Sequence, residues 1–333
     1  MTFRELQRAR RLLCQLQDHL RDTIIAARRK QARTFSRIAA VTAADTIYHV
    51  DRLSEHAIID WFEANWPRAW PVEVIMEGEA EGDVVTFPRG TQVARTIFKC
   101  ILDPIDGTRN LMYDKRSAWI LGALAPQRGA KNHLGDILLA AMTEIPTTKQ
   151  WRSDQLSTVR GQGVVAEAFN LVERSRARLR LTPSRERNCL GGFASFTRFF
   201  PEGKVLTSAI EEKLWDALYG LGKQSGPLVF EDQFLTTGGQ LYEIITGHDR
   251  FIADLRPLVF AKLGYPQLLV CHPYDICTEL IAREAGCVIE APLGGRLRSP
   301  LDTTSPVGWV GFANPALARH IRPVLHRLLK EML

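Results

Sequence analysis

The chain has 333 residues, of which 45% are hydrophobic and 24% are charged, a composition typical of a globular protein that buries a large core. It contains no run of about 18 apolar residues, so we expect no membrane partner, and its charged N-terminal segment does not resemble a secretory signal. The net charge of +6 favours anionic ligands without choosing among nucleic acid, acidic lipid and phosphorylated metabolites.

The six cysteines are scattered along the chain, without a C-x-x-C pair or a histidine at zinc-finger spacing. This pattern predicts buried, reduced thiols rather than disulfides or a zinc site, and it favours a cytoplasmic protein. The positions are Cys14, Cys100, Cys189, Cys271, Cys277 and Cys287.

Two helices are expected near the N-terminus. Apolar residues recur at helical spacing over residues 4–31, and a second helix is expected over residues 51–65, before two prolines. The basic cluster at residues 27–33 could bind nucleic acid, but no aromatic residues interleave it. We interpret it as a solvated helix end and predict no nucleic-acid partner.

Strands and helices then mix along the chain. Strands are expected at residues 72–76, 96–102, 118–125 and 136–145, and residues 149–168 resemble two paired strands around the turn Gly161-x-Gly163. After a compositional shift at 172–188, residues 267–297 have the pattern strand, turn, helix, strand and hairpin, and residues 308–333 that of a strand and a helix. We therefore expect a layered α/β or α+β architecture with an N-terminal α+β lobe, residues 1–180, and a C-terminal α/β lobe, residues 181–333.

Two aspartates end the predicted strand at 96–102. Pro104 restricts the backbone between Asp103 and Asp106, and Gly107 permits a tight turn after them. Both carboxylates and the Ile105 carbonyl can then converge, which suits Mg²⁺, an ion that prefers oxygen ligands. The same residue types are also common in loop turns and helix caps, so this segment alone does not decide between the two interpretations.

Acids at other expected strand ends favour the metal site. Glu77 follows the strand at 72–76, and Asp275 follows the expected strand at 267–271 and opens a helix. Acids at three separate strand ends are what a metal site gathered at one edge of a sheet would require.

Four segments resemble the inositol monophosphatase family of magnesium-dependent, lithium-sensitive phosphatases. They are "DPIDGT" at 103–108, "IMEGE" at 75–79, "PYDICTELIAREAGCVIEAPLGG" at 273–295 and "DTIYHVDRLSE" at 45–55. The superfamily also includes fructose-1,6-bisphosphatases and 3'(2'),5'-bisphosphate nucleotidases. The resemblance implies a two-lobed α-β-α-β-α sandwich, and it is weak over residues 166–235 and 255–270.

The resemblance also implies a role for each site residue. Two Mg²⁺ ions would be held by Glu77, Asp103, the Ile105 carbonyl, Asp106 and Asp275, and Asp51 would assist a third ion. Thr108 would orient the attacking water together with Glu77, and the backbone N–H groups of Gly107 and Thr108 would grip the phosphate. In the family the ions activate the water and stabilise the attacking and leaving oxygens, so Glu77, Asp103 and Thr108 are the expected catalytic residues.

Some positions depart from the family pattern. Two adjacent glutamates are usual where this chain has Glu77, Gly78 and Glu79, so either glutamate could be the ligand, and we favour Glu77 because it directly follows the strand. Asp249 and Asp254 are candidates for sugar-hydroxyl contacts, although they could equally be surface or hairpin acids. We interpret His248 and His272 as surface or core residues.

The expected function is that of a Mg²⁺-dependent phosphomonoesterase acting on a small metabolite similar to inositol monophosphate. The resemblance also implies a homodimer. Fructose 1,6-bisphosphate or a nucleotide bisphosphate are alternative substrates, and a relative that binds a phosphorylated ligand without turnover is an alternative of another class.

Overall fold

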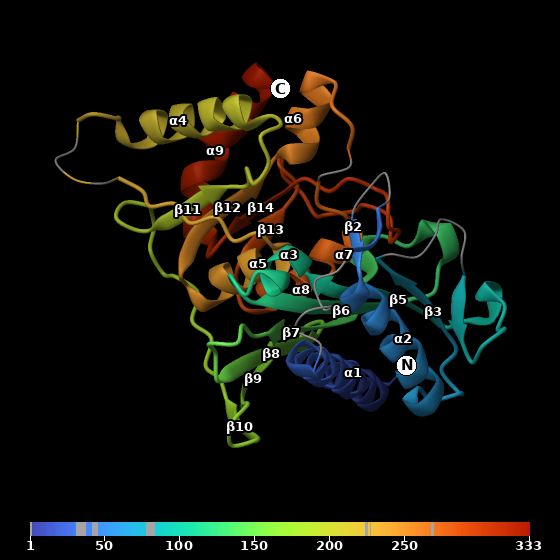
Figure 1. Ribbon diagram of the computed structural model, residues 1–333. Coiled ribbons are helices and arrows are strands. Elements are labelled where there is room, and N and C mark those ends of the chain that lie inside the picture. Colours follow the sequence, from blue (N-terminus) through green and yellow to red (C-terminus); the bar gives the residue numbers. More distant parts are fainter. Residues whose placement is uncertain are drawn as a thin grey trace. The chain divides into compact units, whose positions relative to one another are not determined.

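The computed structural model describes residues 2–30, 38–41, 46–77, 84–223, 226, 228–267 and 270–333 (Figure 1). The chain divides into two compact units. Unit 1 comprises Met1–Arg180, His272–Glu284 and Arg298–Ser305, and unit 2 comprises Leu181–Cys271, Ala285–Leu297 and Pro306–Leu333. The segment around Asp275 therefore belongs to the same unit as Asp103, although the two are far apart in the sequence.

Unit 1 is built on an eight-stranded sheet with the order β10-β9-β8-β7-β6-β5-β3-β4. Adjacent strands in this sheet are antiparallel, except for β3 and β5, which run parallel to each other. The strands are β3 (Val72–Met76), β4 (Val85–Phe87), β5 (Phe98–Asp106), β6 (Ala118–Pro126), β7 (Leu139–Ile145), β8 (Arg152–Val159), β9 (Val164–Asn170) and β10 (Ser175–Arg178). A separate hairpin pairs β1 (Ile38–Val41) with β2 (Thr46–Tyr48).

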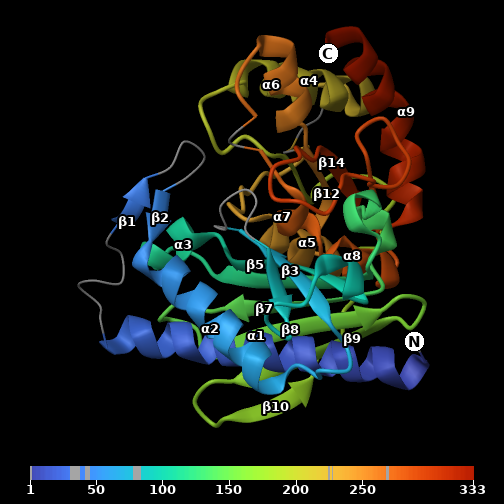
Figure 2. The same ribbon diagram turned by 90° about the vertical axis from the view of Figure 1, so that its right-hand side faces the viewer.

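Helices cover both faces of this sheet (Figure 2). The long helix α1 (Phe3–Lys30) and α2 (His49–Asn65) lie on one face, and the short helices α7 (Pro273–Ile276) and α8 (Glu279–Glu284) lie on the other. A further short helix, α3 (Thr108–Met112), directly follows β5. Unit 1 is thus a three-layer arrangement in which β5 passes between the two helical layers.

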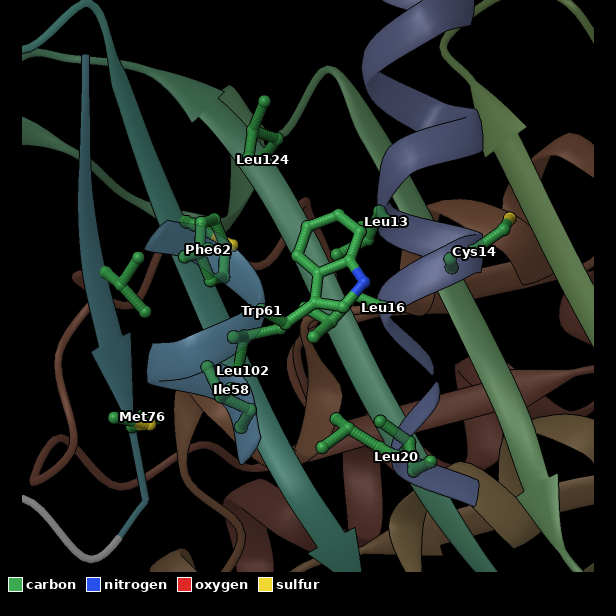
Figure 3. Close-up of a cluster of buried hydrophobic side chains, with 14 of the residues drawn as sticks. Leu13, Cys14, Leu16, Leu20, Ile58, Trp61, Phe62, Met76, Leu102 and Leu124 are labelled. Atoms are coloured by element: carbon green, nitrogen blue, oxygen red, sulfur yellow. The ribbon is translucent and has the colours of Figure 1, made fainter. Parts of the chain in front are cut away.

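The core of unit 1 lies between α1, α2 and the sheet. Figure 3 shows Leu13, Leu16 and Leu20 of α1 among side chains of α2 and the strands, and all three are essentially inaccessible to solvent. Apolar residues at helical spacing on α1 meet apolar residues at alternating positions of the strands, so burial of this face drives the packing.

Gly122 of β6 lies against α1 with no room for a side chain. A Cβ atom there would lie 2.7 Å from Leu102 Cδ2 and 3.2 Å from Leu13 Cδ1. Gly122→Ala is therefore expected to lower the free energy of unfolding by about 1–3 kcal/mol through overpacking. Urea denaturation measures this change, and equal stability of variant and wild type would contradict the close packing.

Unit 2 contains a four-stranded sheet with the order β11-β12-β14-β13. Its elements are β11 (Phe193–Phe196), α4 (Lys204–Tyr219), α5 (Thr237–Thr246), β12 (Asp249–Asp254), α6 (Arg256–Leu263), β13 (Val288–Glu290), β14 (Trp309–Phe312) and α9 (Pro315–Met332). Trp215 of α4 packs edge-on against Phe251, whereas a Cβ at Gly311 would meet Ile244 of α5 on the other face. Helices therefore cover this sheet on both faces too, and the predicted mixed α/β class is confirmed.

Most predicted elements are confirmed, including both N-terminal helices and the hairpin around Gly161 and Gly163. The carboxylate of Glu284 on α8 holds this turn, because it accepts hydrogen bonds from both glycine N–H groups at 2.8 and 2.9 Å. The predicted strand at 267–271 is wrong where it can be judged, since Val270 and Cys271 form no strand and residues 268–269 lie outside the described residues.

The basic end of α1 is only partly the solvated helix end that we predicted. The side chain of Arg28 is 13% exposed, and it donates a hydrogen bond to the Pro146 carbonyl at 2.9 Å. Arg29 and Lys30 are exposed, and residues 31–33 of the cluster lie outside the described residues.

All six cysteines are free and buried, as predicted. None of the helices in the described part of the chain combines the length and the apolar character needed to cross a lipid bilayer.

Candidate metal centre

Asp103 and Asp106 lie within β5 rather than just after it. The strand continues to Asp106, and its pairing with β6 shifts register between the two aspartates, where Pro104 lies. The backbone N–H of Ile105 donates a hydrogen bond to Asp103 Oδ1 at 3.0 Å. The irregular strand end allows both aspartates to face one point, because regular alternation would put residues three apart on opposite faces of the sheet.

Asp275 reaches the same place from α7. The backbone N–H of His272 donates to Asp275 Oδ2 at 2.6 Å, which closes the first turn of this helix, and α7 packs on β5. Asp103, Asp106 and Asp275 each offer a carboxylate oxygen, and these three oxygens lie within 4.8 Å of one another. The structure therefore brings together three of the predicted ligands, one of them through a helix rather than a strand end.

Glu77 lies next to this cluster. It follows β3 directly, and its N–H donates to the Leu102 carbonyl at 3.3 Å, one residue before Asp103 in the neighbouring parallel strand. Burial raises the pKa of Asp103, and the negative charge of the nearby Glu77 raises it further. Glu79 lies outside the described residues, so the preference for Glu77 stays a prediction.

Thr108 and Asp51 meet beside the aspartates. Thr108 Oγ1 lies 3.3 Å from Asp51 Oδ1 and 3.1 Å from the Ile105 carbonyl oxygen, within hydrogen-bonding distance of both. Asp51 is in the first turn of α2, and Thr108 is the first residue of α3. Gly107 between strand and helix has φ 96°, a left-handed conformation that a residue without a Cβ adopts readily.

The electrostatics of the cluster call for a cation. Asp103 is 1% exposed, and burial raises its pKa well above the ordinary value, with further increases from the charges of Glu77, Asp106 and Asp275. Carboxylates packed this closely must bind protons or a positive charge. All the available donors are hard oxygen atoms, so the cluster fits Mg²⁺.

The stability of the metal-free protein is expected to fall as the pH rises above the ordinary carboxyl range. Because the pKa of Asp103 is raised in the folded state, the proton it holds contributes stability below the unfolded value of about 3.9. This contribution is lost as the pH rises through the raised folded value. Mg²⁺ must displace this proton, so its stabilising effect should grow with pH. Thermal unfolding between about pH 4 and pH 8, in EDTA and in Mg²⁺, measures both trends, and a pH-independent Mg²⁺ effect would contradict them.

Asp249 and Asp254 lie in unit 2 at the two ends of β12. Asp254 is fully buried, and its two oxygens accept hydrogen bonds from the Arg256 guanidinium at 2.9 and 2.6 Å. It is therefore not a surface acid. Asp249 is also buried, at 7% exposure, and the proposed sugar contacts of both acids stay predictions.

The backbone of His272 positions Asp275, a contact that the sequence did not lead us to predict. This backbone closes the turn that carries Asp275, and the His272 ring stacks on Tyr274 with centroids 5.4 Å apart. The signal was present in the sequence, because an acid three residues after a helix N-cap is the spacing of a capping box. His248, in contrast, is an exposed residue paired with Glu243, as the surface interpretation predicted.

Comparison with solved structures finds the same fold in three proteins, one of them a fructose-1,6-bisphosphatase. The chain is similar to fructose-1,6-bisphosphatase from Leishmania major, with 12% identity, 96% of this chain and 94% of that chain covered and a TM-score of 0.65. It is also similar to the extragenic suppressor protein SuhB from Bartonella henselae, with 17% identity, coverage of 97% and 98% and a TM-score of 0.64. A Pyrococcus horikoshii protein with similarities to inositol-1 monophosphatase gives 14% identity, coverage of 98% and 99% and a TM-score of 0.60.

No protein-family model and no curated protein matches the sequence. Identities this low show the fold alone, but the coverage is nearly complete in both directions. The chain therefore shares its fold with these three structures, as the resemblance carried by the four sequence segments implied.

Proposed function

We propose that this chain is a magnesium-dependent phosphomonoesterase that acts on a small phosphorylated metabolite similar to inositol monophosphate. One observation carries the proposal: carboxylate oxygens of the buried Asp103 and Asp106 and of the half-buried Asp275 lie within 4.8 Å of one another, in a fold shared with a fructose-1,6-bisphosphatase. A buried cluster of negative charge is unfavourable by itself, and a bound cation makes it favourable.

Each predicted ligand has a place in this proposal. Glu77, Asp103, the Ile105 carbonyl, Asp106 and Asp275 would hold two Mg²⁺ ions, and Asp51 would assist a third. When bound, the ions would supply Lewis acidity to the phosphoryl oxygens and lower the pKa of the attacking water.

The chain's own residues would position the reactants. Thr108 Oγ1, already within hydrogen-bonding distance of Asp51 and the Ile105 carbonyl, would orient the attacking water together with Glu77. The N–H groups of Gly107 and Thr108 stand where α3 begins and would bind a phosphate oxygen, because the first N–H groups of a helix have no acceptor within it. The net charge of +6 would favour the arrival of anionic esters.

The test is a screen for phosphate release from inositol, sugar and nucleotide phosphates, with and without Mg²⁺. We expect Mg²⁺-dependent turnover that is fastest on an inositol monophosphate and is inhibited by Li⁺. We also propose that the enzyme is a cytoplasmic homodimer. Preference for fructose 1,6-bisphosphate or a 3',5'-bisphosphate nucleotide would show that the proposed substrate is wrong, but it would support the proposed metal-dependent hydrolysis. Binding of a phosphate ester without turnover would leave the ligand-binding relative as the correct interpretation.

A further inference from the structure

Four arginines occupy alternate positions along the edge of the sheet in unit 1. They are Arg174, Arg176, Arg178 and Arg180, in and beside β10, and all four are exposed. Alternate residues of a strand project to the same face, so Arg176 and Arg178 share one face of β10. Arg174, in the turn before the strand, and Arg180, just after it, flank them, and we call the four residues the arginine row. The row is independent of the metal centre.

The first two arginines of the row are neutralised by α1. Arg174 Nη2 lies 3.2 Å from Asp22 Oδ2, and Arg176 forms an ion pair with Asp18. β10 and α1 run antiparallel, because the later arginine of the strand pairs with the earlier aspartate of the helix. The spacing also fits, since two residues of strand span about 6.6 Å and four residues of helix span about 6 Å.

The last two arginines, Arg178 and Arg180, continue the strand beyond these ion pairs. Continued along the strand, the same register leads toward the N-terminal half of the helix, which carries the exposed Arg11 seven residues before Asp18 and so on the same helical face. Arg4 lies another seven residues earlier on that face and is also exposed. Within the described residues, no carboxylate lies within 4 Å of the guanidinium groups of Arg178, Arg180, Arg11 and Arg4. The row thus ends in uncompensated positive charge.

β10 also has an open side. It is the terminal strand of the described sheet and pairs only with β9. The N–H of Leu179 donates to the Ala166 carbonyl at 2.9 Å, so in an antiparallel ladder the odd residues of β10 bond to β9. The backbone N–H and C=O groups of Arg176, Arg178 and Arg180 therefore point away from the sheet.

We propose that the β10 edge docks an extended acidic segment of a partner protein, which adds to the sheet as a further antiparallel strand. Backbone groups of Arg178 and Arg180 would pair with the segment, and acidic residues at every second position would lie opposite their guanidinium groups. Strand addition at an open edge obtains affinity from main-chain hydrogen bonds and specificity from alternate side chains. Opposite charges directly across two strands stabilise such pairing.

The arginine row could have three other roles: protection of the sheet edge, membrane binding and nucleic-acid binding. Each explains fewer of its features than docking of an acidic strand does. Charges on an edge strand protect against unwanted pairing, but protection makes no use of the outward backbone groups of Arg178 and Arg180. A membrane-binding surface would carry exposed aromatic or leucine side chains among its charges, whereas the exposed Trp151 and Val172 lie at the turn that precedes β10, at the opposite end of the strand from Arg178 and Arg180. Nucleic acid would contact the same charges but would make no use of the outward backbone groups.

The experiment measures binding of a labelled, end-blocked peptide of alternating glutamate and threonine to the full chain. Its control is a peptide of the same composition with all glutamates in one block. We expect the alternating peptide to bind more tightly, to protect the amides of Arg178 and Arg180 from hydrogen exchange, and to lose about tenfold in affinity with R178E/R180E. The matched control R185E/R187E changes two exposed arginines of equal spacing outside any strand, and it should leave the affinity unchanged.

Three results would overturn the proposal. They are equal binding of the two peptides, equal loss with both double variants, or binding of random duplex DNA but of neither peptide. Because R178E/R180E lies outside the candidate metal centre, its phosphatase activity should match that of the wild type, so this test does not depend on the proposed function.

Discussion

Asp103→Asn is expected to slow magnesium-dependent phosphate release roughly a hundredfold to a thousandfold and, at the same time, to raise the unfolding temperature of the metal-free protein. The carboxylate is 1% exposed and surrounded by the charges of Glu77, Asp106 and Asp275, so a neutral amide of the same shape removes repulsion. The same change removes a ligand that a bound cation needs, and losing one preorganised electrostatic contact slows catalysis roughly a hundredfold to a thousandfold. Opposite effects on activity and stability are typical of functional sites.

The measurements are phosphate release on the best substrate and thermal unfolding in EDTA and in Mg²⁺. Mg²⁺ should stabilise the wild type much more than the variant. Asp60→Asn, at an exposed position of α2, is the matched control and should change neither quantity. If Asp103→Asn lowered the stability in EDTA, Asp103 would be a structural residue, and the proposal of a metal centre would lose its main support.

Asp254→Ala is expected to destabilise unit 2 by about 3–5 kcal/mol, because it leaves a mostly buried guanidinium without its carboxylate. Asp254 is fully buried, and the Arg256 side chain is 10% exposed. The arginine also packs against the rings of Phe199 and Phe200, at 5.2 and 5.8 Å from their centroids, so it cannot easily turn to solvent.

Urea denaturation of Asp254→Ala measures this loss, with the exposed Glu202→Ala as a control that should change the stability by less than about 0.5 kcal/mol. Replacing both partners, in Asp254→Leu/Arg256→Met, should recover most of the loss, because no unpaired charge then remains. A double variant as unstable as Asp254→Ala would show that the ion pair is not the cause.

The sequence predicted the parts of the candidate site that depend on local chemistry. A strand that ends in Asp-Pro-Ile-Asp-Gly-Thr limits its own backbone, and the structure places Asp103, Asp106 and Thr108 around this segment. Glu77 could also be predicted from the sequence, because an acid that directly follows an apolar strand lies at the edge of the sheet. The helices α1 and α2 followed from apolar periodicity, which burial against the sheet enforces.

The sequence was less informative where a residue's surroundings come from distant segments. The strand expected before Asp275 is absent at Val270 and Cys271, and a capped turn of α7 on β5 delivers this carboxylate instead. Asp254 had the pattern of a possible surface acid, yet it is buried against Arg256.

By itself, the sequence determined the acids of the candidate centre, the mixed α/β class and the resemblance to magnesium-dependent phosphatases, because each of these depends on residue types at short spacing. Only the tertiary structure decided that Asp275 meets Asp103, and that the arginine row is neutralised at one end and uncompensated at the other. Both depend on segments more than a hundred residues apart packing together, and the free energy of that packing comes from burial of the whole core rather than from the local sequence.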